Sequence, residues 1–289
     1  MYDLTNIGTL QKIFSECGFN LKKGLGQNFI VDPDVCPKMA ELAGIDGKCV
    51  LEIGPGAGVL TCELAKRAKK VVSVEVDKNL EPILQKTLAD FSNTEVIFGD
   101  IMKTDLHQLI SEKFGNEKIC VCANLPYYIT SPIIMMLLES AAPIESVTVM
   151  VQKEAAVRLC AEMGTRDCGA VTAAVRFYSE PNILMNISKS SFLPPPKVDS
   201  AVIGLNVKDE SQLPAVDKNK FFKVIKASFG MRRKTLINCL SAHLDGMDKE
   251  YILGKMNVCS IDAAARAEQL TLQQFIDLTN SLYGDCRGK

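Results

Sequence analysis

The chain has 289 residues, of which 47% are hydrophobic and 23% charged, the balance of an ordinary soluble globular protein. This length suffices for one large domain or for a domain with a small companion. No apolar run reaches the ~18 residues that a membrane-spanning helix needs, so no membrane span is expected. Residues 1–18 resemble neither a secretory signal nor a transit peptide, which favours the cytoplasm.

The cysteines are expected to be thiols. There are 11 of them with no Cys-x-x-Cys pair, and several lie within apolar runs, where cysteine behaves as a small hydrophobe. The only two histidines, His107 and His243, have no cysteine at zinc-binding spacing. We therefore expect no structural metal and a reducing compartment.

The net charge of −1 gives no hint of a polyanionic partner. The distribution of charge along the chain is more informative. Residues 209–289 carry 12 Lys and Arg against 10 Asp and Glu. A run of basic residues in this part is interrupted by no acidic residue. It comprises Lys220, Lys223, Lys226, Arg232, Arg233 and Lys234. Alone, such a run is more often a solvated helix face, and the competing hypothesis is a surface that binds nucleic-acid phosphates.

Short apolar runs alternate with amphipathic helical stretches such as 59–68 in the first part of the chain, which predicts a parallel sheet covered on both faces. The expected strands are Cys49–Ile53, Val71–Val76, Glu95–Phe98, Ile119–Ala123 and Val147–Val151.

The pattern changes after Gln152. A helix is expected over 153–162 and is followed by an apolar stretch over 170–178. Two β-rich runs, 182–188 and 198–207, are joined by a loop containing three prolines and predict a terminal antiparallel hairpin. Residues 209–217 form a polar linker. Beyond it, helices are expected over 218–229, 234–243, 249–255, 262–267 and 271–282.

A glycine loop, Gly54-Pro55-Gly56-Ala57-Gly58, follows the first strand and opens a helix. Closely spaced glycines let the backbone turn sharply and approach a ligand, and the helix N-terminus presents free N–H groups. A dinucleotide fingerprint would require glycine where Val59 stands. The spacing therefore favours an adenosyl ligand over a pyrophosphate.

Two acidic residues stand at the ends of the next strands. Glu75 ends the second strand and is suited to accept hydrogen bonds from ribose hydroxyls, whereas Asp100 closes the third strand and can accept from an adenine amino group. The carboxyl ends of parallel strands meet at one edge of the sheet, where open α/β sheets bind ligands.

The fourth strand ends in Asn124-Leu125-Pro126-Tyr127-Tyr128. The Asn124 side-chain oxygen and the Leu125 carbonyl can accept both N–H bonds of an adenine amino group, which frees its lone pair for attack on a methyl group. Tyr127 offers a ring on which a base can stack. This motif predicts methylation of an exocyclic amine, by positioning and without a general base of shifted pKa.

With these motifs the chain resembles the ribosomal RNA small-subunit adenine dimethyltransferases. The resemblance spans nearly the whole sequence. It rests on Lys22–Phe29 with its Gly26-Gln27-Asn28-Phe29, the glycine loop, Asn124–Tyr128, Val151–Glu154, Phe192–Ser200 and Phe229–Leu236. The sequence departs from the family pattern at Ala57, where leucine is frequent, and at Cys168, where tyrosine is common.

The resemblance implies an α/β fold: a Rossmann-like class I methyltransferase sheet, mostly parallel with a terminal antiparallel hairpin, plus a small all-α C-terminal domain. Residues 1–208 would bind S-adenosylmethionine and catalyse transfer to N6 of two adjacent adenosines near the 3′ end of small-subunit (16S) rRNA. Residues 209–289 would bind RNA. The partner would be this rRNA or an assembling small subunit.

The resemblance also assigns residues. Phe192 should face Tyr127 across the target base, so that the catalytic group comprises Asn124, Leu125, Tyr127 and Phe192. The cofactor site should comprise Asn28, Ile30, Gly54, Gly56, Glu75, Asp100 and Asn124.

Three alternatives remain open at this point. The chain could be an RNA-binding assembly factor that has lost catalysis, although such a protein has no need of the Asn124–Tyr128 motif. It could also methylate DNA adenine or protein glutamine, for which similar motifs serve. The 23S rRNA methyltransferases of antibiotic resistance share the N-terminal motifs but typically lack the Arg-Arg-Lys-Thr-Leu helix start found here.

Overall fold

The computed structural model describes residues 2–20, 26–115, 117–231 and 233–284. The chain divides into two compact units, the first formed by residues 1–156 and 180–207 and the second by residues 157–179 and 208–289. The assignment of cofactor binding to one part and RNA binding to the other remains a prediction. No helix among the described residues is long and apolar enough to cross a membrane.

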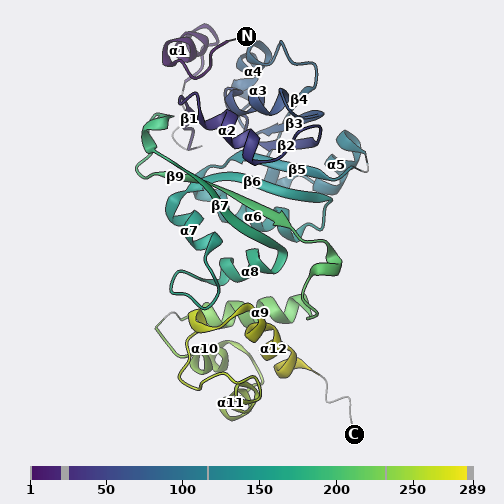
Figure 1. Cartoon of the computed structure of the whole chain (residues 1–289), viewed down its shortest axis with the longest axis vertical. Coiled ribbons are helices and arrows are strands. Elements are labelled where there is room, and N and C mark those ends of the chain that lie inside the picture. The colour runs from purple at the N-terminus through teal and green to yellow at the C-terminus, as the bar shows by residue number, and fades with distance from the viewer. Residues whose placement is uncertain (1, 21–25, 116, 232, 285–289) are drawn as a thin grey trace. The chain divides into compact units, whose positions relative to one another are not determined.

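The first unit is built on a seven-stranded sheet of order β4-β3-β2-β5-β6-β9-β7 (Figure 1). Its strands from β2 to β6 pair in parallel, and β9 pairs antiparallel with β6. Short strands β1 and β8 form a separate antiparallel pair. The strands are β1 (Phe29–Ile30), β2 (Cys49–Ile53), β3 (Lys70–Glu75), β4 (Thr94–Phe98), β5 (Ile119–Asn124), β6 (Ile144–Gln152), β7 (Ser179–Ile187), β8 (Phe192–Leu193) and β9 (Ser200–Val207).

Helices cover both faces of this sheet (Figure 1). Alternate residues of a strand point to opposite faces, so every residue of β2 is buried. The helices in this part of the chain are α1 (Ile7–Glu16), α2 (Val35–Leu42), α3 (Val59–Ala65), α4 (Glu81–Thr87), α5 (Leu106–Phe114), α6 (Thr130–Glu139) and α7 (Lys153–Cys160).

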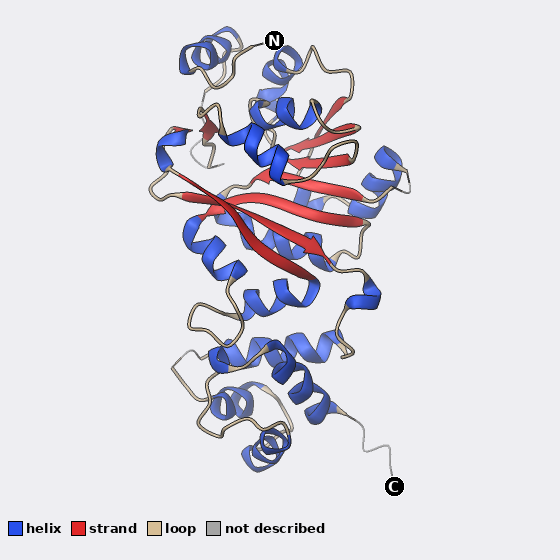
Figure 2. Cartoon of the chain, viewed as in Figure 1, coloured by secondary structure: helices blue, strands red, loops and turns tan. Residues whose placement is uncertain are grey.

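The second unit is helical (Figure 2) and comprises α8 (Ala170–Tyr178), α9 (Lys218–Phe229), α10 (Leu236–His243), α11 (Lys249–Val258) and α12 (Leu272–Tyr283). Asp217 caps α9 by accepting from the Lys220 N–H. Phe221, Val224 and Ile225 are buried on this helix. Ring contacts join Phe177 on α8 to Phe221, with centroids 4.9 Å apart.

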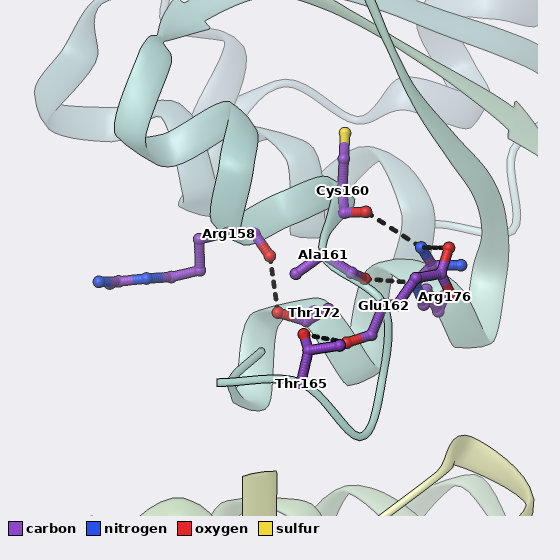
Figure 3. A network of polar contacts seen from close by, with 7 residues as sticks. All are labelled: Arg158, Cys160, Ala161, Glu162, Thr165, Thr172 and Arg176. Atoms are coloured by element: carbon purple, nitrogen blue, oxygen red, sulfur yellow. Dashed lines mark hydrogen bonds and ion pairs between the residues drawn. The ribbon is translucent and has the colours of Figure 1, made fainter. Parts of the chain in front are cut away.

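A network of polar contacts holds the connection between α7 and α8 (Figure 3). The Arg176 guanidinium on α8 donates to the carbonyls of Cys160 and Ala161 and pairs with Glu162. Thr172 donates to the Arg158 carbonyl at 2.7 Å. Cys168, which replaces the tyrosine of the family pattern, is buried in this connection.

The fold class and the predicted strands of the parallel sheet are confirmed, with shifts of up to three residues at their ends. The terminal β-rich runs are strands β7 and β9, neighbours in the sheet. The Lys208 N–H donates to the Tyr178 carbonyl, which sets the start of β7 beside the end of β9, as an antiparallel pair requires.

The helix predicted over 262–267 is wrong. The Asp262 carboxylate accepts from the Ala264 N–H and the Asp262 carbonyl accepts from the Ala265 N–H, so the chain makes a turn there. A single 3₁₀ turn, Ala267–Gln269, follows. An aspartate at the start of so short a segment satisfies the backbone locally and competes with the helix. Likewise, α10 begins at Leu236 and not at Lys234, because Thr235 has extended dihedral angles.

Candidate active site

A cavity of about 340 Å³ lies at the carboxyl ends of the parallel strands. It is lined by five segments, each following or flanking a strand: residues 26–30, 53–60, 74–80, 99–102 and 124–133. This is the edge at which open α/β sheets bind ligands, because the strand-to-helix loops converge there.

The glycine loop forms one wall of this cavity. Gly54, Gly56 and Gly58 have φ angles of +70°, +59° and +89°, a region that side chains disfavour. At Gly56 a Cβ would also lie 3.4 Å from the Phe29 ring, in van der Waals contact with the N-terminal segment. The sequence places glycine where the turn geometry requires it.

Glu75 stands at the end of β3 and is buried. One of its carboxylate oxygens accepts from the Gly56 N–H at 3.2 Å and the other from the Asp77 N–H at 2.8 Å. Burial raises the pKa of Glu75, and these backbone hydrogen bonds oppose the rise. The carboxylate thereby joins the glycine loop to the end of β3 on the cavity wall.

Asp100 closes the third parallel strand in a more open position. Its carboxylate accepts from the Met102 N–H at 3.0 Å, which caps a 3₁₀ turn, and lies 3.6 Å from the Lys103 ammonium. Gln27 donates to Asp77 at 3.0 Å and so connects the N-terminal segment to the residues after β3. Asp100 and Gln27 both line the cavity, so these contacts hold two parts of its wall.

Asn124 ends β5 with its side chain directed by the N-terminal segment. Its Nδ2 donates to the Asn28 carbonyl at 3.3 Å. No described residue donates a hydrogen bond to its Oδ1, so this oxygen is available to a ligand. The Leu125 N–H donates to the Met150 carbonyl of β6, which fixes the turn that follows. The cavity wall therefore carries an acceptor whose orientation is set by the protein.

Tyr127 lines the same cavity, and its hydroxyl bonds to strand β9. Tyr127 Oη and Ser200 Oγ are 2.7 Å apart, and Ser200 is fully buried. Burial raises the pKa of Tyr127, with the Ser200 hydrogen bond acting in the opposite direction. Tyr128, in contrast, is 61% exposed at the rim.

The predicted residues converge, with one exception. Lining one cavity are Asn28, Ile30, Gly54, Gly56, Glu75, Asp100, Asn124, Leu125 and Tyr127. Phe192 is absent from its lining. The Phe192 ring is 3% exposed in the core, and the residue pairs with Ile30 between β8 and β1. A base could stack on this ring only after the covering side chains move, so its stacking role remains a prediction.

Several lining residues were not predicted from the sequence, among them Ile101, Met102 and Tyr128. Their positions beside Asp100 and Tyr127 were the available signal. Ser200 belongs to a recognised motif, yet nothing in the sequence indicates its bond to Tyr127. No group of three or more His, Cys, Asp or Glu side chains suited to a metal ion occurs among the described residues.

The predicted basic residues lie in the second unit, and none of the described ones is among the residues that line this cavity. Lys220, Lys223 and Lys226 are exposed at three-residue spacing on α9, which keeps them on one side of the helix. Arg233 and Lys234 are exposed in the turn before α10. Arg232 lies outside the described residues, as do Lys22 and Lys23 of the N-terminal motif.

The strand order, the antiparallel insertion of β9 between β6 and β7, and the cavity at the carboxyl edge define a class I methyltransferase fold. Within that class, the chain belongs to the family of ribosomal RNA adenine dimethylases, whose model matches residues 18–283.

Close relatives match most of the length of the chain. The ribosomal RNA small subunit methyltransferase A of Alkaliphilus metalliredigens is 45% identical over 265 residues, 91% of this chain and 92% of the relative. That of Geobacillus thermodenitrificans is 44% identical and covers 97% of each.

Solved structures agree with this assignment. A dimethyladenosine transferase from Plasmodium falciparum superposes with a TM-score of 0.73 at 27% identity, covering 86% of this chain and 95% of that one. The 23S rRNA methyltransferase ErmE gives a TM-score of 0.68 at 25% identity, covering 88% and 99% respectively.

Proposed function

We propose that this enzyme transfers methyl groups from S-adenosylmethionine to N6 of two adjacent adenosines near the 3′ end of small-subunit (16S) rRNA, as a step in ribosome biogenesis. The names of its relatives, ribosomal RNA small subunit methyltransferase A, support the substrate. The observation that carries the chemistry is the Asn124–Tyr127 turn on the wall of the cavity that the glycine loop and Glu75 also line.

The cavity residues fit this cofactor. The glycine loop permits close approach of a ligand to backbone, and Glu75 has buried carboxylate oxygens with lone pairs suited to ribose hydroxyls. Asp100 can accept from the adenine amino group of the cofactor. When bound, S-adenosylmethionine supplies a methyl group on a sulfonium, which needs no metal or redox partner.

Asn124 and Leu125 would act on the target base. An adenine amino group is a weak nucleophile because its lone pair is delocalised into the ring. Acceptance of its two N–H bonds by Asn124 Oδ1 and the Leu125 carbonyl localises that pair, and the proton is lost after transfer. Because the Asn124 amide is already oriented by Asn28, little reorganisation is needed at the moment of reaction.

The target base must leave its helix before its amino group can reach this cavity. Tyr127 would then stack on the base, a contact worth about 1–3 kcal/mol. The basic residues of the second unit, Lys220, Lys223, Lys226, Arg232, Arg233 and Lys234, would bind phosphates of the RNA. Catalysis in this scheme is mainly positioning of the amine in line with the sulfonium.

Single-turnover methylation with labelled cofactor tests this proposal, using small-subunit particles that lack the methyl groups. At saturating cofactor and particles, Asn124→Ala should transfer methyl groups about 10²–10³-fold more slowly than wild type. Glu75→Ala should instead weaken cofactor binding more than tenfold in calorimetry, because hydrogen bonds to a charged group contribute roughly 1.5–3 kcal/mol.

The same assay distinguishes the alternatives. Label in DNA, in protein or in large-subunit rRNA, and none in the small-subunit particles, would overturn the proposed substrate. Particle binding without transfer by the wild type would make the chain a binding factor. An Asn124→Ala variant that transfers at the wild-type rate would show that the catalytic site is misplaced.

A further inference from the structure

A second hollow of the first unit lies close to the active site. It is lined by Lys153, Glu154, Lys189, Lys197, Val198 and Asp199, and we call it the lysine groove. Three of its six lining residues are lysines, all exposed. They come from three separate segments: the start of α7, the 3₁₀ turn Lys189–Ser191, and the loop before β9.

Asp199 holds these segments together. Its carbonyl accepts from the Lys153 N–H at 3.0 Å, and its carboxylate accepts from the Lys189 N–H at 3.0 Å. These two hydrogen bonds fix the spacing of the backbone segments that carry the lysines. One of them uses the Asp199 carbonyl and the other uses one oxygen of the Asp199 carboxylate.

The groove lysines differ from most other cationic side chains of the same unit. At the amino end of the sheet, Lys48 pairs with Glu145 at 2.8 Å and Lys69 with Glu117 at 2.7 Å. No carboxylate of the described residues lies within ion-pairing distance of the ammonium groups of Lys153, Lys189 or Lys197. Three ammonium groups without an ion-pair partner therefore line a common hollow. The carboxylates of Glu154 and Asp199 line it as well, so its formal charge is three minus two, or +1, the sign that an anionic ligand requires.

The groove adjoins the proposed target-base site. Gln152, which precedes Lys153, pairs with Ser200 between β6 and β9. Ser200 follows Asp199 and bonds to the Tyr127 hydroxyl. A chain of direct contacts therefore runs from the ring on which the target base would stack to the backbone that positions the lysines.

We propose that the lysine groove binds phosphates of the RNA strand immediately flanking the target adenosine. This inference rests on the proposed function and adds a phosphate site within the catalytic unit itself. Lysine suits such a site because a compact ammonium contacts phosphate oxygens without demanding one orientation. A strand held there would keep the flipped base over Tyr127 during both methyl transfers.

The test combines three changes, Lys153→Gln, Lys189→Gln and Lys197→Gln, in the full-length enzyme. The control replaces Lys48, Lys66 and Lys69 by Gln, which removes the same charge from ion-paired lysines near the amino end of the sheet, of which Lys48 is half-buried and the other two are exposed. Binding to unmethylated small-subunit particles is measured by filter retention from 50 to 300 mM salt, alongside single-turnover methylation, cofactor affinity and thermal unfolding.

The groove variant should bind particles at least tenfold more weakly at 50 mM salt. Its log–log salt slope should fall by about 2, since each phosphate contact to a single strand contributes roughly 0.7. The control should keep the wild-type slope, and both variants should keep wild-type cofactor affinity. Thermal unfolding checks that both variants are folded at the assay temperature, since the control loses three ion pairs. A groove variant with the wild-type slope overturns the phosphate site.

Different results would overturn the assignment of the groove as a phosphate site and the proposed function. If the wild type methylates particles and the groove variant binds them equally well, only the groove assignment falls. If the wild type transfers no methyl group to the particles, the proposed function falls. If it also binds none, the groove assignment falls with it. Equal slope changes in the groove and control variants mean a general charge effect and also overturn the groove.

Discussion

Tyr127 shares a hydrogen bond with a residue on a different element, and this bond bears on catalysis. The Tyr127 hydroxyl and Ser200 Oγ lie 2.7 Å apart, with Ser200 fully buried on β9. Tyrosine rings rotate readily about two side-chain bonds unless packing or a hydrogen bond holds them. We infer that Ser200 keeps the Tyr127 ring in the orientation that a stacked base needs.

Ser200→Ala should slow single-turnover methylation about 2–10-fold at saturating substrates, the equivalent of one net hydrogen bond of roughly 0.5–1.5 kcal/mol. In a Tyr127→Phe background the same change should have no further effect, because the hydroxyl partner is already gone. Ser200→Thr, which retains a hydroxyl, should restore part of the rate. Additive effects of Ser200→Ala and Tyr127→Phe would show that Ser200 acts on folding or packing and not through Tyr127.

The sequence was sufficient to predict the cavity residues that stand at strand ends, because strand ends are readable. Gly54, Glu75, Asp100 and Asn124 each follow or end a parallel strand, and parallel strands bring their carboxyl ends to one edge. The location of Phe192 was not readable in this way. It lies in a two-residue strand paired with β1, and so short a pairing leaves no periodicity in the sequence.

Glu52 joins three elements around the glycine loop. It is buried in β2, where one carboxylate oxygen accepts from Thr61 on α3 at 2.7 Å and from Ser73 on β3 at 2.6 Å. The other oxygen has no partner among the described residues. Burial raises the pKa of Glu52 to about 7, against the effect of both hydrogen bonds. The carboxyl therefore carries a proton in the folded protein at mildly acidic pH.

This raised pKa makes stability depend on pH. An unfolded glutamate titrates near 4.5, so between about pH 4.5 and pH 7 the folded state binds more protons than the unfolded state. The stabilisation is complete below about 4.5 and is lost as the pH rises through about 7. The shift corresponds to roughly 3 kcal/mol as an upper limit. Burial raises the pKa of Glu75 as well, and its contribution has the same sign.

Glu52→Gln should remove the contribution of Glu52, because the amide oxygen can still accept from Thr61 and Ser73 but carries no proton equilibrium. In urea unfolding, the variant and the wild type should differ little at pH 5. At pH 8 the variant should be more stable by up to about 3 kcal/mol. Glu41→Gln, on the exposed side of α2, serves as control. Parallel pH profiles of wild type and Glu52→Gln would contradict a raised pKa at this position.

At the scale of elements, long periodic segments were predicted well and short ones poorly. Helix α9 has a cap, a buried apolar side and a polar side over 12 residues, and all three features predict the same helix. The segment 262–267 has only alanine content in its favour, and the local hydrogen bonds of Asp262 override that preference. Helices α1 and α2 were not predicted, although Asn6 caps α1.

At the scale of the whole molecule, the basic side chains occur in two settings. Many basic residues of the first unit pair with carboxylates, whereas the second unit has exposed lysines on one side of α9. The Lys220 ammonium lies 5.5 Å from the centre of the Tyr283 ring, an attractive arrangement that leaves the charge uncompensated. The sequence alone could locate the run of basic residues from Lys220 to Lys234. It could not decide whether this run is a solvated helix face or a phosphate-binding face. Its role therefore needs a measurement that counts phosphate contacts.

Replacing Lys220, Lys223 and Lys226 by Gln should lower the salt slope of binding to unmethylated small-subunit particles by about 2 if all three contact phosphate. Cofactor affinity should not change, because none of these lysines lines the cofactor cavity. The control replaces Lys249, Lys255 and Arg266 of the same unit by Gln, which removes an equal charge and should leave the slope nearly unchanged. A wild-type slope in the α9 variant would show that these lysines are only a solvated helix face. The RNA contacts of the second unit would then have to come from other residues, such as Arg233 and Lys234.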